Sequence, residues 1–131
     1  MPELLGDNWK DWIEYADDDR AEAFLALKRG SWRDACFHAQ QACEKLLKAF
    51  LIKQGVFIPV HDPKTLAQEA SRYLAGLTLL LNRLDTLTKH YYASRYPDAA
   101  RRLGVVYNRE TAEECVKVME ELWRMLRGKV S

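Results

Sequence analysis

Apolar residues recur at alternating steps of three and four in four long stretches of the chain, and this helical period restricts what the chain can fold into. Such steps place apolar side chains along one stripe of an α-helix. The clearest stripe consists of Leu77, Leu80, Leu84, Leu87 and Tyr91. The pattern therefore predicts an all-α protein whose helices bury their stripes against one another.

Glycine and proline residues indicate where the predicted helices begin and end. The long helices are expected at residues 7–28, 31–54, 75–93 and 108–128, the last beginning at Asn108 or Thr111. Asp62 and Pro63 are typical of the N-cap and first turn of a short helix, which should continue to about residue 73. Pro97 ends the third long helix, and residues 98–107 are expected to form a loop. Because short links favour antiparallel neighbours, we predict an up-and-down four-helix bundle with one additional short helix.

The composition is typical of a single globular domain, which we expect to cover residues 1–131. Hydrophobic residues make up 48% and charged residues 30% of the chain, and a chain of this length can bury one core. The formal net charge is +1, so any contact with a polyanion must be local. No apolar run approaches the roughly 20 residues of a membrane span, and the first eight residues lack a signal-peptide pattern. We therefore expect a cytoplasmic protein without membrane contact.

Three cysteines, Cys36, Cys43 and Cys115, lie on apolar helical stripes. Their number is odd, and they form neither a CxxC pair nor a Cys/His pattern with metal-ligand spacing. We therefore predict buried, reduced thiols, which suit a cytoplasmic protein. The sequence predicts neither a metal site nor a cofactor.

One arginine and one histidine of the third long helix are the candidates for catalysis. Arg83 and His90 are seven residues apart, about 700° around a helix, so they share a face with a rise of about 10.5 Å. The imidazole would take the 2′-hydroxyl proton of RNA while Arg83 stabilises the phosphate, as in metal-independent cleavage. Alternatively, Arg83 pairs with Asp85 or with an acid of a neighbouring helix, and His90 forms a hydrogen bond at the surface. Leu79 lies on the same face, where an exposed leucine would indicate a contact between two copies.

Several segments resemble one known family. The segment ACFHAQQACEKLLKA at residues 35–49, His61, Leu66, Tyr92 and the tetrapeptide RYPD at residues 95–98 occur in that order. Together they resemble the HEPN domain, named for higher eukaryotes and prokaryotes nucleotide-binding, over nearly the whole chain. The resemblance implies a homodimeric helical bundle that partners a small nucleotidyltransferase, often in a toxin–antitoxin pair. Many relatives are ribonucleases with an arginine, four to six residues and then a histidine, a spacing that Arg83 and His90 fit at its long limit.

The resemblance also implies a nucleotide- or RNA-binding surface on the polar side of the second long helix and on the RYPD segment. The residues concerned are Gln41, Glu44, Lys45, Lys48, Tyr92, Arg95, Tyr96 and Asp98. Arg95 would hold a phosphate, and Tyr96 would stack on a base. His61 is expected to orient its loop against the bundle.

A purely structural interpretation of these residues is also open. Gln41, Glu44 and Lys48 share one helical face, where Glu44 and Lys48 would form an i,i+4 ion pair worth about 0.3–0.5 kcal/mol, with Gln41 solvated. Tyr96 would then fill a gap in the packing, and Asp98 would cap a turn. The sequence thus leaves three hypotheses: a nucleotide- or RNA-binding domain with a nucleotidyltransferase partner, a metal-independent endoribonuclease, and a non-catalytic dimeric scaffold.

Overall fold

A computed structural model describes the backbone of residues 2–131 and the side chains of residues 8–131. Across this part of the chain the regular elements are α-helices and 3-10 helices, without a β-strand, which confirms the prediction of an all-α protein. Met1, which the predicted domain includes, lies outside the described residues. None of the described helices combines the length and the apolar composition that crossing a membrane requires.

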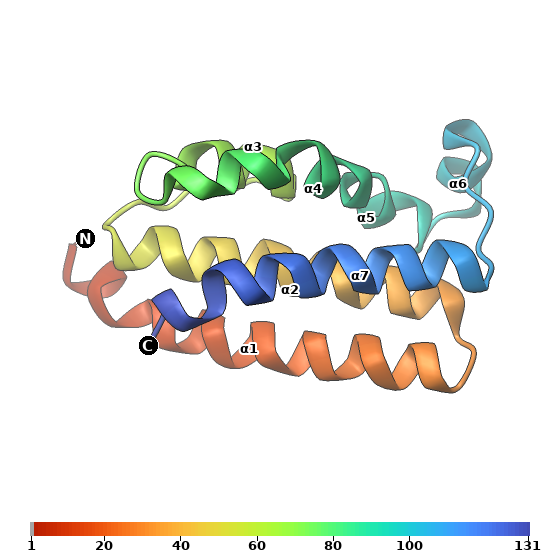
Figure 1. Cartoon of the computed structure of the whole chain (residues 1–131), viewed down its shortest axis with the longest axis horizontal. Coiled ribbons are helices and arrows are strands. Elements are labelled where there is room, and N and C mark those ends of the chain that lie inside the picture. The colour runs from red at the N-terminus through yellow and green to blue at the C-terminus, as the bar shows by residue number, and fades with distance from the viewer. Residues whose placement is uncertain (1) are drawn as a thin grey trace.

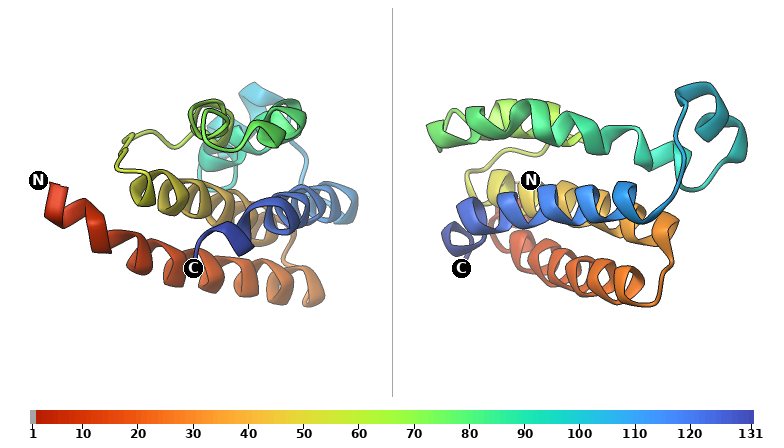
Figure 2. Two further views of the ribbon diagram at one scale, coloured as in Figure 1. Left: turned by 60° about the vertical axis from the view of Figure 1, so that its left-hand side comes forward. Right: turned by 45° about the vertical axis from the view of Figure 1, so that its right-hand side comes forward.

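Helix α2 (Trp32–Lys53) lies at the centre of the molecule. In Figures 1 and 2, α1 (Pro2–Lys28) lies on one side of α2, and the layer with α3 (Pro63–Ala70) and α4 (Leu81–Thr88) lies on the other. Helix α7 (Arg109–Leu126) packs against α2 and also contacts α1 and α4. A helix with apolar residues over a wide arc can contact several neighbours at once. The fold therefore depends on α2, which also carries most of the predicted binding residues outside the RYPD segment.

The third predicted long helix is interrupted. Instead of one helix over residues 75–93, the chain forms the 3-10 helix η1 (Ala75–Leu80), then α4, and then the short helix α5 (His90–Ala93). The leucines of the predicted stripe are buried nevertheless: Leu77, Leu80, Leu84 and Leu87. The prediction of a continuous helix was therefore wrong, because the core can accept the same leucines from a tighter and interrupted helical path.

A helix also forms where a loop was expected. Helix α6 (Pro97–Leu103) occupies most of the predicted loop over residues 98–107. Pro97 is its first residue, a position where the missing N–H of proline costs no helical hydrogen bond. Gly104 closes the helix with a left-handed φ of 66°. None of its residues is buried, and Figures 1 and 2 show α6 standing off one end of the molecule.

Other local predictions are confirmed. Asn108 caps α7, because its side-chain oxygen accepts a hydrogen bond from the Thr111 backbone N–H at 2.9 Å. The three cysteines are free thiols, and all are buried: Cys36, Cys43 and Cys115. Burial raises the pKa of the Cys43 thiol, so it stays protonated.

Asp62 begins α3 and also connects it to α4. Its carboxylate accepts hydrogen bonds from the Lys64 backbone N–H at 2.9 Å, from the Thr65 hydroxyl at 2.7 Å and from the Thr88 hydroxyl at 2.8 Å. Partial burial acts to raise the pKa of this carboxyl. The hydrogen bonds from Thr65, Thr88 and the backbone N–H groups outweigh burial, so the pKa lies below its usual value.

We predict that Asp62→Ala lowers the free energy of unfolding by about 1 kcal/mol near neutral pH. Because the folded-state pKa is lowered, the carboxylate stabilises the fold above its unfolded-state pKa near 3.8, and this stabilisation is lost as the pH falls through the folded-state pKa. Urea denaturation near neutral pH and in acid measures both effects, with the exposed Asp85→Ala as the control. A variant effect of equal size at both pH values would contradict the prediction.

Candidate functional site

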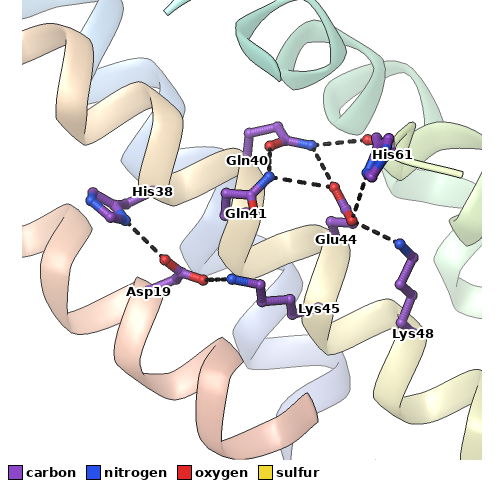
Figure 3. Close-up of polar contacts among 8 residues, drawn as sticks. All are labelled: Asp19, His38, Gln40, Gln41, Glu44, Lys45, Lys48 and His61. Carbon is purple, nitrogen blue, oxygen red and sulfur yellow. Dashed lines mark hydrogen bonds and ion pairs between the residues drawn. The ribbon is translucent and has the colours of Figure 1, made fainter. Parts of the chain in front are cut away.

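Polar side chains gather around Glu44 on one side of α2, as Figure 3 shows. Glu44 Oε2 accepts hydrogen bonds from Lys48 Nζ at 2.8 Å and from His61 Nδ1 at 3.1 Å. Gln40 Nε2 donates to Glu44 Oε1 at 3.1 Å and to the His61 carbonyl at 2.9 Å. Gln41 Nε2 lies 3.5 Å from Glu44 Oε1 and donates to Gln40 Oε1 at 2.7 Å. The network joins α2 to the segment before α3, and both carboxylate oxygens of Glu44 have donors from the protein.

The ion pair between Glu44 and Lys48 is buried, with 5% of each side chain exposed. Lys48 Nζ also lies 5.3 Å from the ring centroid of Trp12 on α1, at cation–π distance. A buried charge needs a partner charge and hydrogen bonds to replace the water it has lost. The predicted ion pair is therefore present but buried, because α1 and the segment with His61 cover it.

Lys45 belongs to a second group, which joins α1 and α2. Its Nζ binds the Asp19 carboxylate, whose other oxygen lies 2.9 Å from His38 Nδ1. Burial acts to raise the pKa of Asp19, but hydrogen bonds from His38 and Lys45 outweigh it, so the pKa is lowered. Lys45 is thus already paired, and it points toward α1 while Glu44 faces His61 (Figure 3).

The RYPD segment meets α2 through aromatic rings. His61 stacks on Tyr91, with ring centroids 4.2 Å apart. The Arg95 guanidinium lies 4.5 Å from the Tyr91 ring centroid and 5.4 Å from that of Phe37 on α2. The structure therefore brings Arg95 beside the Glu44 network, and His61 and Tyr91 connect the two.

Arg95 differs from Lys45 and Lys48 in having no acidic partner among the described residues. Its side chain is exposed, and its hydrogen bond goes from Nε to the Tyr91 carbonyl at 3.1 Å. The Tyr96 ring, 54% exposed, has its centroid 5.7 Å from the guanidinium. Arg95 therefore presents an uncompensated positive charge between aromatic rings, an arrangement suited to a phosphate.

An open pocket of about 460 Å³ lies between α5 and α6. Arg95 does not line it, but the Tyr96 ring, whose centroid is 5.7 Å from the Arg95 guanidinium, does. Its lining residues are Tyr92, Tyr96, Asp98, Ala99, Arg102 and Leu103. Exposure of Tyr96 does not fit the interpretation of this ring as a packing residue. Asp98 pairs with Arg101 in the first turn of α6 rather than capping a turn. Three of the predicted binding residues thus line one pocket.

Arg83 and His90 have separate partners within the protein. Arg83 pairs with Glu121 and, at 3.1 Å, with Glu114, both on α7, as the structural alternative predicted. His90 is 2% exposed rather than at the surface, and its Nδ1 lies 2.7 Å from the Tyr107 hydroxyl. Burial, with a smaller effect of Lys89, lowers the pKa of His90 to about 4. This geometry does not favour the ribonuclease hypothesis, which stays a prediction.

Sequence reasoning missed several residues that build the site. Tyr91 was assigned to the apolar stripe, and Gln40, Phe37 and Asp19 were not among the predicted site residues. Gln40 precedes Glu44 by one helical turn, a spacing that could have indicated their hydrogen bond. The stacking of His61 on Tyr91 has no local signal, because the two residues are distant in sequence.

The chain was compared with known proteins. The family model described as the HEPN domain matches residues 9–129. A protein of Methanocaldococcus jannaschii named "Putative toxin MJ1304" is 27% identical over 129 residues, which cover 88% of this chain and 84% of that protein.

Two solved structures are similar along most of their length. TT1696 from Thermus thermophilus is 29% identical with a TM-score of 0.82, and the match covers 94% of this chain and 98% of that chain. ST0689, described as an archaeal HEPN homologue, is 27% identical with a TM-score of 0.71 and the same coverage. The described fold therefore occurs in experimental structures.

We predict that Lys48→Met lowers the free energy of unfolding by about 3–5 kcal/mol, because it leaves the Glu44 charge buried without its cation. Adding Glu44→Gln should restore part of this loss, since the neutral amide no longer needs a cation. Urea denaturation of the two single variants and the double variant measures the coupling.

The exposed ion pair between Glu69 and Arg72 is the control for the buried pair between Glu44 and Lys48. Its Arg72 side chain is 73% exposed, so Arg72→Met should change the free energy of unfolding by less than about 1 kcal/mol. Equal effects of Lys48→Met and Arg72→Met would show that burial of the Glu44 pair has no energetic consequence.

Proposed function

The chain belongs to the HEPN domain family, and from this premise we propose that it is an up-and-down helical bundle that binds a nucleotide or an RNA end at Arg95. The observation that carries the proposal is the exposed Arg95 guanidinium, which lies 4.5 Å from the Tyr91 ring and lacks an acidic partner among the described residues. An unpaired guanidinium held beside aromatic rings is suited to bind a phosphate through charge-assisted hydrogen bonds.

The pocket between α5 and α6 supplies the surface for a base. Its volume of about 460 Å³ lies in the range of small-molecule sites. Tyr92 and Tyr96 are 55% and 54% exposed, and an exposed aromatic ring accepts any base by stacking. Arg102 adds a second cation at the rim. In this proposal, one bound nucleotide has its phosphate on Arg95 and its base stacked beside Tyr96.

The Glu44 network has a positioning role in this proposal. The charges of Glu44 and Lys48 compensate each other, so neither is free to hold an anion. Their hydrogen bonds fix His61, which stacks on Tyr91, and Arg95 lies against the same tyrosine ring. The network thus holds the ring beside Arg95 rather than contacting the ligand itself.

We also propose that the chain forms a homodimer and partners a small nucleotidyltransferase in a toxin–antitoxin pair. The family supports this proposal, as does the toxin name of the relative from Methanocaldococcus jannaschii. On this chain, Leu79 is 79% exposed and α6 buries none of its residues. Both features favour a protein contact at these positions.

The non-catalytic scaffold is the second candidate. It is favoured by Arg83, which is paired with two glutamates of α7, and by His90, which is buried. In a scaffold, Arg95 would serve only to pack on Tyr91 and Phe37, and no nucleotide would bind.

We predict that Arg95→Ala weakens binding of a labelled single-stranded oligoribonucleotide by roughly 10- to 100-fold, as expected for loss of a charge-assisted hydrogen bond. The slope of log Kd against log salt concentration should fall by about 0.7, because one phosphate contact is lost. Fluorescence anisotropy over a salt series measures both, and competition with free nucleotide separates the two ligand classes.

Arg72→Ala is the matched control for Arg95→Ala, because Arg72 is exposed, does not line the pocket and is paired with Glu69. It should leave the affinity nearly unchanged. Wild-type protein that binds neither the oligoribonucleotide nor a nucleotide would favour the scaffold. Cleavage of the RNA in EDTA that disappears in His90→Ala would instead support the ribonuclease hypothesis.

For the homodimer, light scattering should give twice the monomer mass of 15.2 kDa. Leu79→Glu should shift the protein toward the monomer, because it places a charge in an apolar contact. A monomeric wild type at high concentration would contradict the homodimer without affecting the assignment of Arg95.

A further inference from the structure

Two thiols and one imidazole from three different helices meet in the interior of the molecule. Cys36 comes from α2, His90 from α5 and Cys115 from α7, and their ligand atoms all lie within 4.8 Å of one another. All three residues are buried, with 0%, 2% and 3% of their surfaces exposed. The two sulfur atoms are 2.8 Å apart. This cluster plays no part in the proposed function and stands independently of it.

We propose that Cys36, His90 and Cys115 form a binding site for a zinc-class divalent metal ion. Two sulfur ligands and one imidazole are a donor set that zinc accepts. At Zn–S distances of about 2.3 Å, tetrahedral geometry places the two sulfurs about 3.8 Å apart. They must therefore separate by about 1 Å on binding, a change that small rotations about the cysteine side-chain bonds supply.

The charge balance of the site selects a divalent ion. Each thiol releases its proton to solvent when it becomes a thiolate ligand, so one M²⁺ replaces two H⁺. The product, M²⁺ with two thiolates and a neutral imidazole, has no net charge. A neutral complex can remain in the apolar interior, whereas a monovalent ion would leave a buried negative charge.

The surroundings of His90 fit a metal ligand. Nδ1 of the ring lies 2.7 Å from the Tyr107 hydroxyl, and when Nδ1 donates this hydrogen bond, Nε2 has a free lone pair for the ion. Metal-binding histidines usually have their second nitrogen held by such a partner, which fixes the ring and the tautomer. The three protein ligands leave one tetrahedral position for a water molecule.

Binding of the ion would connect three helices that are far apart in sequence. Cys36 and Cys115 are separated by 79 residues, and α5, which carries His90, lies directly before Arg95. The ion therefore holds the chain around α5 against α2 and α7, and its role is structural. Cys43 is buried on the same helix as Cys36 but lies outside the cluster, so it provides a matched control.

The experiment uses the untagged chain, reduced without thiol reagents, stripped with EDTA and titrated with Co²⁺ and then with Zn²⁺. We expect a thiolate-to-cobalt charge-transfer band that saturates at one equivalent and disappears when Zn²⁺ displaces the cobalt. Zn²⁺ should also raise the melting temperature. Cys36→Ala and Cys115→Ala should abolish the band, and Cys43→Ala should retain it.

Tyr107→Phe tests the site without removing a ligand. It should weaken the affinity for Zn²⁺ roughly 10- to 100-fold and leave the cobalt band in place at higher metal concentration. If the cysteine variants fail to fold, the wild-type cobalt spectrum and this variant decide the question.

Three results would overturn the proposal. The reduced wild type could lack the charge-transfer band, or Cys36→Ala and Cys115→Ala could bind as well as Cys43→Ala, which would indicate an adventitious ion only. The third result concerns protein purified without reductant. Its mass would be lower by two hydrogens and two thiols would be lost, and the protein would not bind Zn²⁺ after reduction. That outcome would identify the pair as a disulfide instead.

Discussion

The buried carboxylate of Glu44 is the constraint on which the candidate site depends. A charge at the centre of the helical core is stable only when cations and hydrogen-bond donors surround it. Here Lys48 supplies the cation, and Gln40, Gln41 and His61 supply donors. Satisfying this one charge therefore fixes where the segment before α3 crosses α2, and through His61 it fixes the ring of Tyr91.

The two candidate arginines show how the surroundings of a charge decide its availability. Arg83 faces two glutamates of α7, which neutralise it and fix its direction. Arg95 lies over aromatic rings and binds a carbonyl oxygen, so its positive charge is not compensated. The sequence made both residues candidate phosphate ligands, since the difference between them comes from residues on other helices.

Local features were predicted well because their causes are local. The helical period, the Asp62 and Asn108 caps and the burial of the leucine stripe follow from neighbours within a few residues. Two predictions failed because the sequence feature behind each of them is compatible with two different backbone structures. Pro97 was taken only as a helix end, although proline also begins helices, and the leucine stripe did not reveal the interruption at Lys89.

The sequence by itself determined an all-α protein and, through the segments ACFHAQQACEKLLKA and RYPD, the family. Only the tertiary structure decided which polar groups are buried and which are available. Glu44 and His90 proved to be interior, Arg95 exposed, and Cys36 adjacent to Cys115 across 79 residues. The physical reason is that helical period and capping act over a few residues, whereas burial and charge compensation depend on which helices pack together.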